Sequence, residues 1–251
     1  MNMIVTAPRW TNAKMEISKD ESLNPLKQNA KKGRLRYMKN CFPHHGYLWN
    51  YGVLPQTWED SRQIHSETNA RGPNDLIGVF DISEEVGFSG QVKQVKVLGA
   101  LAVIENEEIN WRIIVIDALS PNAAKLDDVA DIDRVYPSLL SATREWLIVS
   151  ELPDGKPAKV LAFDGHFKDK LYTMDVILNS HDAWVRIIRG QIPSWGLSMF
   201  EIALTEAHPD FLSRAIMAPP AFPLYPLLLA ILLVLLGCEV LEATVADPEV
   251  S

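Results

Sequence analysis

Residues 92–116 read VKQVKVLGALAVIENEEINWRIIVI, and this stretch decides the expected fold. It contains two runs rich in Val, Ile and Leu, residues 92–98 and 111–116, of a composition that favours β-strands. The four residues 105–108, ENEE, are polar and lie between the runs. A polar break between two strand-like runs is typical of a hairpin, so the stretch predicts two strands joined by an acidic tip.

Upstream of this hairpin, the first ninety residues are irregular and dense in Gly, Pro, Asn and aromatic residues. Short β-type runs lie between the turns; residues 46–52, GYLWNYG, predict an aromatic strand bounded by glycines. Several short strands separated by close turn signals favour a small closed barrel.

Downstream, two segments predict helices. Residues 136–148 carry apolar residues at helical spacing, with Pro137 near the expected start. Residues 168–189 carry a second apolar stripe, expected to form the buried face: Leu171, Met174, Leu178, Trp184 and Ile188. Because the strands precede the helices, we expect an α+β fold that is mainly β.

The composition suits one globular domain, since 47% of the 251 residues are apolar and 22% are charged. The net charge of −8 argues against nucleic-acid binding. The basic residues 1–39 face either an anionic ligand or the acidic remainder of the fold. Cys41 and Cys238 are too few for a disulfide framework, and no signal peptide opens the chain, so we expect a cytoplasmic protein.

The composition changes near residue 190, so we expect a domain at 1–190 and an extension at 191–251. Residues 215–238 are uncharged, but four prolines interrupt their first half. Only residues 227–238 could form an unbroken apolar helix, whose length of about 18 Å is short of the ~30 Å hydrocarbon core. Membrane association of this tail, packing on the body or a partner, and no folded role all stay open.

Several segments resemble the eukaryotic, fungal-type soluble inorganic pyrophosphatases: residues 8–17 (PRWTNAKMEI), 32–36 (KGRLR), 42–47 (FPHHGY), 50–60 (NYGVLPQTWED), 90–99 (GQVKQVKVLG) and 153–157 (PDGKP). They follow one another in the family's order and at its spacing, although the strands that usually begin the family's domain have no counterpart. The resemblance implies a five-stranded closed barrel of the OB type, with flanking strands and two or more helices.

The family hydrolyses inorganic diphosphate to two phosphates with Mg²⁺. Diphosphate repels an attacking nucleophile, so the site must neutralise phosphate oxygens and activate water, and Mg²⁺ requires oxygen ligands at fixed positions. The resemblance therefore implies Mg²⁺ as cofactor and gives each matching residue a role. It implies a catalytic base at Asp75, substrate binding at Lys14, Arg36, Tyr51 and Arg112, and metal binding at Glu16 and Glu105.

The same comparison predicts a degraded site. The family's segment Gly-Asp-Xaa-Asp-Pro-Xaa-Asp reads GPNDLIG at residues 72–78, so Pro73 and Gly78 replace two aspartates and only Asp75 remains. A Tyr-Lys pair before PDGKP is replaced by Ser150 and Glu151. Other expected carboxylates are replaced by Thr6, Asn29 and Asn110. We therefore expect weak or lost hydrolysis.

Other interpretations stay open for the surviving residues. Lys14 and Glu16 fit an inherited ion pair on one strand face, Arg36 a solvated basic edge, Tyr51 aromatic packing, and Asp75 a turn. A metal site at the His44–His45 pair lacks other ligands at suitable spacing. The resemblance also implies a homodimer whose interface includes Arg9, Trp10 and His45.

Whether the chain is an enzyme also stays open, because three functions remain. The first is a weak Mg²⁺-dependent diphosphatase. The second is a non-catalytic homologue, or a heterodimer partner of a true pyrophosphatase. The third is a small-molecule pocket with a new role in a diphosphate-releasing, secondary-metabolite pathway.

Overall fold

The computed structural model describes residues 1–19, 21, 23–194 and 196–197. Its strands are β1 Asn2–Ala7, β2 Met15–Ile17, β3 Leu26–Gln28, β4 Ala30–Lys31, β5 Arg34–Leu35, β6 Asn50–Val53, β7 Gly78–Asp81, β8 Val92–Glu105, β9 Glu108–Asp117 and β10 Val160–Leu161. Its α-helices are α1 Ile132–Val135, α2 Leu139–Val149 and α3 Lys170–Ile188, and short 3₁₀ turns lie at Ala123–Lys125, Val129–Asp131, Leu152–Asp154 and Ala162–Gly165. The expected α+β, mainly β fold is confirmed.

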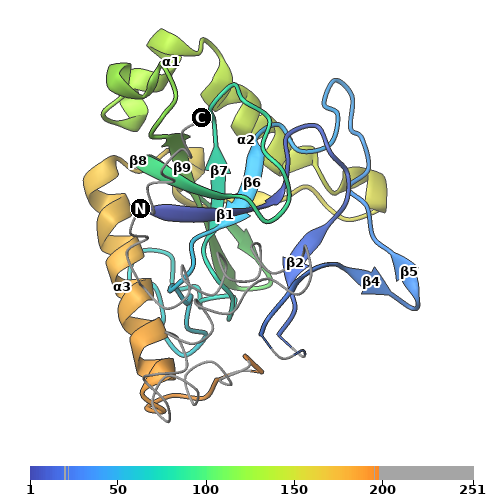
Figure 1. Ribbon diagram of the computed structural model, residues 1–251, viewed down its shortest axis with the longest axis vertical. Helices are drawn as coiled ribbons and strands as arrows, with labels where there is room; N and C mark the ends of the chain where they lie inside the picture. Colours follow the sequence, from blue (N-terminus) through green and yellow to red (C-terminus); the bar gives the residue numbers. More distant parts are fainter. Residues whose placement is uncertain (20, 22, 195, 198–251) are drawn as a thin grey trace, which may run out of the picture.

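Five strands form a closed barrel in the order β1-β6-β7-β9-β8, with β1 pairing β8 to complete the ring (Figure 1). Strand β1 has a partner at both edges, since Ile4 pairs with Val53 of β6 and with Val92 of β8. The pairing of β7 with β9 is parallel, whereas the other four pairings of the ring are antiparallel. The predicted five-stranded closed barrel is therefore confirmed.

The hairpin predicted from residues 92–116 is confirmed and is longer than its two apolar runs. Glu105 pairs with Glu108, and the two-residue turn between them places Asn106 and Glu107 at positive φ. Such a turn matches the right-handed twist of paired strands. Strand β8 bends at a bulge beside Gly99, where a Cβ atom would lie 2.6 Å from the carbonyl oxygen of Lys168.

The strand expected at residues 46–52 is wrong over its first half, because the strand β6 begins only at Asn50. Gly46 has φ +55°, and a Cβ there would lie 2.3 Å from the carbonyl oxygen of Thr11. Trp49 is 2% exposed, and its ring stacks on Phe80 at 4.7 Å. The aromatic residues of this segment therefore pack in the core instead of extending the sheet.

Both expected helices are present, but the apolar stripe predicted for the second is only partly its buried face: Met174 and Trp184 pack against the core, and two leucines do not. Leu171 and Leu178 are 75% and 53% exposed, whereas Ile177 is 4% exposed. The buried face alternates small residues with isoleucines and consists of Thr173, Ile177, Ser180, Ala183 and Ile187. Small side chains let a helix approach a sheet closely, and the hydroxyl group of Thr173 is satisfied by donating to the carbonyl oxygen of Asp169.

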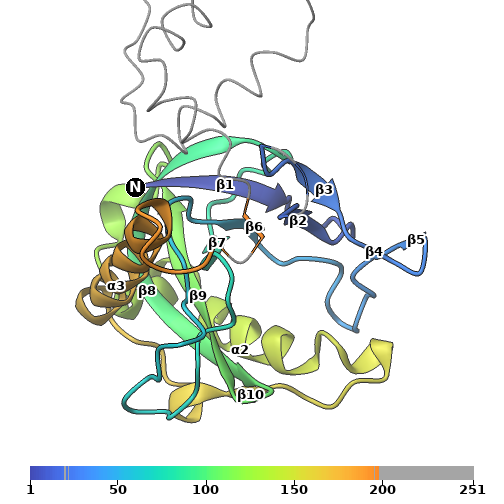
Figure 2. The ribbon, with the colours of Figure 1, turned by 90° about the horizontal axis from the view of Figure 1, so that it is seen from below.

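The two faces of the barrel strands pack against different helices. Val79 and Ile113 belong to the cluster that includes Ile177 of α3, whereas Phe80 belongs to the cluster that includes Trp146 of α2. Strands β2 to β5 form two small ribbons on the side of the barrel opposite α3, as the two views of Figure 1 and Figure 2 show. The space between these ribbons, β6 and α2 holds the candidate site.

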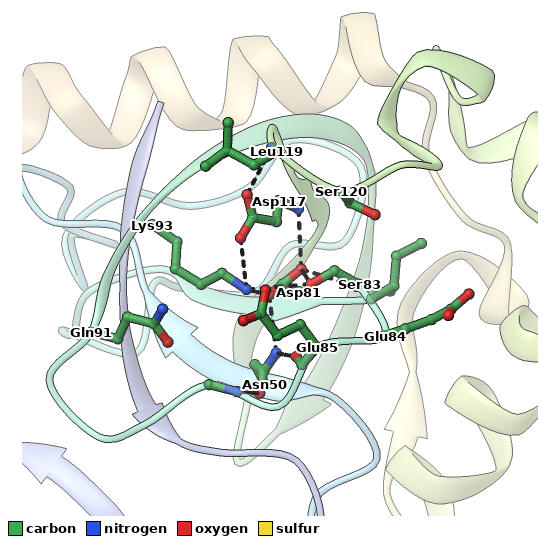
Figure 3. Close-up of polar contacts among 12 residues, drawn as sticks. Asn50, Asp81, Ser83, Glu84, Glu85, Gln91, Lys93, Asp117, Leu119 and Ser120 are labelled. Carbon is green, nitrogen blue, oxygen red and sulfur yellow. Dashed lines mark hydrogen bonds and ion pairs between the residues drawn. The ribbon is translucent and has the colours of Figure 1, made fainter.

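A buried ionic network joins β6, β7, β8 and β9 (Figure 3). The ammonium group of Lys93 lies 2.6 Å from Asp81 and 2.9 Å from Asp117, and the carboxylate of Asp81 also accepts hydrogen bonds from Asn50 and Ser83. Asp81 and the side chain of Lys93 are at most 2% exposed. Burial lowers the pKa of Lys93, but the two aspartates outweigh this effect, and the net shift is upward.

No helix within the described residues is long and apolar enough to cross a membrane. The Pro-broken apolar segment expected at residues 215–238, and nearly all of the expected extension 191–251, lie outside the described residues.

Candidate functional site

A cavity of about 280 Å³ opens beside the barrel, between the β2–β5 ribbons and α2. Its lining includes six of the seven predicted site residues: Lys14, Glu16, Arg36, Tyr51, Glu105 and Arg112. They come from strands β2, β6, β8 and β9, from the residue just before β2 and from the segment after β5, all of which the fold brings together. The seventh predicted residue, Asp75, does not belong to this lining.

One wall of the cavity is aromatic. The rings of Tyr47 and Tyr51 stack with centroids 5.5 Å apart and an interplanar angle of 6°, and Trp146 lies against Tyr47 at 5.8 Å. Burial is the main cause that raises the pKa of Tyr47. No role was predicted for Tyr47, although its place at the end of the resembling segment 42–47 was a usable signal.

The β2–β5 side of the cavity is polar, and Asn29 forms hydrogen bonds with two of its charged side chains. The side-chain amide of Asn29 donates to the carboxylate of Glu16 at 2.5 Å and accepts from the guanidinium of Arg36 at 3.3 Å. Lys14 lies 3.4 Å from Asp154, which also pairs with Lys39. The neutral amide thus links an acidic and a basic residue that were both predicted to contact ligands.

Arg112 occupies space that Gly78 leaves open. The two residues pair in the β7–β9 register, and a Cβ atom at Gly78 would lie 2.9 Å from a terminal nitrogen of Arg112 and 3.0 Å from the hydroxyl of Tyr51. The Arg112 guanidinium donates to the carbonyl of Trp111 at 2.8 Å and lies 6.0 Å above the Tyr51 ring. A side chain at position 78 would displace this guanidinium.

Two lysines that sequence reasoning did not assign, Lys156 and Lys159, hold the acidic residues at the far end of the cavity. Both pair with Glu151, Lys159 at 3.1 Å, and both also lie near Glu105, at 3.7 and 3.9 Å. Burial raises the pKa of Glu151, but the two ammonium groups outweigh it and bring the pKa down to about 2. Burial lowers the pKa of Lys159. Glu151 lines the cavity, but its charge is compensated.

Asp75 lies outside the cavity, on the loop before β7. Its carboxylate is 56% exposed and pairs with Lys19 at 3.1 Å. The ammonium of Lys19 also donates to the carbonyl oxygen of Asn74 at 3.0 Å and lies 5.0 Å from the centroid of the Trp58 ring. The role of Asp75 as a base stays a prediction, and its carboxylate already has a cationic partner.

The described residues do not fit a magnesium site. They contain no group of three or more His, Cys, Asp or Glu side chains placed to hold a metal ion. Each carboxylate that lines the cavity is engaged by the chain itself: Glu16 by Asn29, and Glu105 and Glu151 by the two lysines. Magnesium prefers several oxygen ligands in near-octahedral geometry, which this arrangement does not offer.

The described parts of the proposed dimer surface are mostly exposed. Trp10 is 58% exposed, His45 is exposed, and the nearby Phe42 is 96% exposed. Arg9 differs, because its guanidinium donates to the carbonyl oxygens of Ile82 and Glu84 at 3.3 Å and lies 5.7 Å from the Trp10 ring. The His44 side chain, 3.3 Å from Glu145, has no metal-binding set around it within the described residues.

The sequence and the fold have counterparts in known proteins. A model of the family described as inorganic pyrophosphatase matches residues 3–185. The chain therefore belongs to the inorganic pyrophosphatase family. Members of this family generally depend on magnesium, bind diphosphate and typically form oligomers.

Individual relatives support the same assignment. The inorganic pyrophosphatase of Neurospora crassa is 50% identical over 226 residues, which cover 90% of this chain and 76% of that one. That of Emericella nidulans is 53% identical over 199 residues, 79% of this chain and 69% of that one.

Solved structures agree with the sequence relatives. The inorganic pyrophosphatase of Schistosoma japonicum aligns with a TM-score of 0.73 at 47% identity, covering 74% of this chain and 66% of that one. An N-terminally truncated vacuolar soluble pyrophosphatase of Trypanosoma cruzi in complex with PPi aligns with a TM-score of 0.71 at 37% identity, covering 75% of this chain and 70% of that one.

Proposed function

We propose that this protein binds inorganic diphosphate in the cavity but hydrolyses it at least about a thousandfold more slowly than a relative with a full set of acidic residues, a difference of ~4 kcal/mol in the barrier. Membership of the family and the T. cruzi complex with PPi support the choice of ligand. The retained Lys14, Arg36, Tyr51 and Arg112 supply donors of the kind that phosphate oxygens accept.

The observation that carries the proposal is that three positions where the family resemblance places aspartates have no carboxylate. Pro73 and Gly78 offer no side-chain oxygen, and Asn110 offers only a neutral one. A reaction that depends on several metal ions fails steeply when the ligands they share are lost. Without those ions, the chain's remaining groups can orient diphosphate and neutralise part of its charge, but they do not generate a strong nucleophile from water.

Phosphate release from diphosphate, measured with Mg²⁺ titrated well above physiological levels, tests this proposal against the Neurospora crassa enzyme in the same buffer. We expect a rate at least about a thousandfold lower at every Mg²⁺ concentration. Release within tenfold of that enzyme, abolished by Asp75→Asn, would contradict the proposal. It would also assign Asp75 the role of the base.

We also propose that the chain forms a homodimer through the surface of Arg9, Trp10 and His45. Exposed aromatic residues next to an arginine are common anchors of protein interfaces, and Phe42 enlarges this apolar surface. Light scattering should give a dimer for the parent protein and a monomer for Trp10→Ala. Phe88→Ala is the matched control, because Phe88 is equally exposed, at 57%, and is not assigned to the interface. A dimer that survives Trp10→Ala would contradict the proposed surface.

A further inference from the structure

Cationic side chains lie beside three positions where the family resemblance places metal-binding or catalytic carboxylates. Lys156 and Lys159 lie near Glu105, the expected metal ligand at the end of β8. Arg112 fills the space next to Gly78, where an aspartate is expected. Lys19 pairs with Asp75 on the loop before β7.

The cavity carries excess positive charge as a result. Five cationic side chains line it (Lys14, Arg36, Arg112, Lys156 and Lys159), against three carboxylates (Glu16, Glu105 and Glu151). A site built to hold several divalent cations needs the opposite excess. At about 280 Å³ the cavity is also smaller than most sites for drug-sized ligands, and its polar lining suits a compact anion.

We propose that this cavity binds a small phosphate polyanion directly through its lysine and arginine side chains, with no divalent metal ion between protein and ligand. The choice of ligand rests on the proposed function, whereas the independence from metal rests on the cations named above. The ammonium groups of Lys156 and Lys159 and the guanidinium of Arg112 neutralise phosphate oxygens that metal ions contact in a metal-dependent site.

The effect of neutralising Glu151 on ligand affinity distinguishes a metal-free anion site from a metal site. The carboxylate of Glu151 pairs with both Lys156 and Lys159. It therefore repels an incoming anion and competes with that anion for the N–H donors of the two lysines. Two unit charges about 4 Å apart interact by roughly 4 kcal/mol at an effective dielectric constant near 20, so removing the negative charge of Glu151 should change the affinity for an anion measurably. In a metal-free anion site, Glu151→Gln strengthens binding. In a metal site, the loss of a carboxylate weakens it.

Isothermal titration calorimetry with inorganic diphosphate tests the proposal on the full chain, once in excess chelator and once with Mg²⁺. We expect saturable binding in chelator, about tenfold tighter for Glu151→Gln and at least about tenfold weaker for Lys159→Gln. Lys96→Gln is the matched control, because Lys96 also pairs with a carboxylate, at 2.6 Å, but lies outside the cavity. Its affinity should equal that of the parent protein.

Binding that is absent in chelator and appears only with Mg²⁺, or that weakens in Glu151→Gln, would overturn the proposal. Because the two cavity variants must change in opposite directions, a general loss of folding cannot imitate the expected result. Fast phosphate release in the presence of Mg²⁺ would contradict only the proposed slow hydrolysis. The titration in chelator measures affinity in the absence of Mg²⁺, so its result tests metal-free binding independently of the hydrolysis rate.

Discussion

A terminal nitrogen of Arg112 lies 2.9 Å from the point that a Cβ atom would occupy at Gly78. The glycine therefore leaves room for a guanidinium at a position where the family resemblance places an aspartate. The missing carboxylate and the guanidinium of Arg112 therefore concern the same small region beside the cavity.

The first prediction concerns this pair alone. In Gly78→Asp, the new carboxylate should pair with Arg112, which can shift because the close contact is with the end of a flexible side chain. Diphosphate binding in chelator should weaken by at least about tenfold, since one cation is neutralised. Calorimetry checks this outcome. Gly78→Ala is the control for size: if it weakens binding as much as the aspartate does, displacement and not charge is the cause.

The second prediction concerns restoration of the acidic set. Pro73→Asp, Gly78→Asp, Asn110→Asp and Glu151→Lys together should raise Mg²⁺ affinity and phosphate release, whereas each single change should do little. The effects should be strongly non-additive because the restored ligands hold the same ions. A folded combined variant that binds no Mg²⁺ by calorimetry would show that these positions do not form one metal site.

The third prediction concerns pH and Glu59. Glu59 is buried at 6% exposure, accepts a hydrogen bond from the backbone N–H of Trp111 at 3.0 Å, and has its pKa raised by burial to about 8. The folded state thus holds a proton that the unfolded state releases above its pKa of 4.5. Stability should therefore fall as pH rises from 4.5 towards 8, by up to about 1.4 kcal/mol per pH unit.

Urea unfolding at a series of pH values checks this slope. Glu59→Gln keeps an acceptor for the Trp111 N–H and carries no titratable proton, so it should remove the slope and be the more stable protein at pH 8 and above. Glu107→Gln, at the exposed tip of the hairpin, should leave the slope as it is. An unchanged slope in Glu59→Gln would mean that Glu59 is already ionised in the folded protein.

The fourth prediction concerns the ionic network that joins the barrel strands. Lys93→Met leaves the buried carboxylate of Asp81 without its cation and should destabilise the fold by about 3–5 kcal/mol. Lys96→Met, three residues further along the same strand, breaks an exposed pair with Asp127 and should cost at most about 1 kcal/mol. Chemical denaturation measures both. Equal losses would show that burial does not distinguish the two pairs.

Much of the barrel was predictable because its signals are local. The β8–β9 hairpin follows from apolar runs on both sides of a polar turn, and neither depends on the rest of the chain. The buried face of α3 was not predictable in this way. Its apolar residues suggested one face, but close packing selected another, lined by Thr173, Ser180 and Ala183.

The candidate site likewise contains residues that the sequence identifies and residues that only the folded structure shows. Six residues were assigned from the family resemblance, and the fold brings all six to one cavity. Lys159 and Lys19 had no such signal, because Lys159 approaches Glu105 and Lys19 approaches Asp75 only after distant segments have packed. Asp75 was assigned from its motif, and the motif alone does not show that Lys19 pairs with its carboxylate.

The aromatic wall gives the molecule an optical reporter of its own. The indole of Trp146 lines the cavity and lies 5.8 Å from Tyr47, and its N–H donates to the carbonyl oxygen of Gly46 at 3.0 Å. A charged ligand that enters beside this indole changes the electric field across it, so its emission should shift with occupancy. The chain has seven tryptophans, and the difference between the parent protein and Trp146→Phe isolates this one. Occupancy of the cavity can thus be followed in solution without a label.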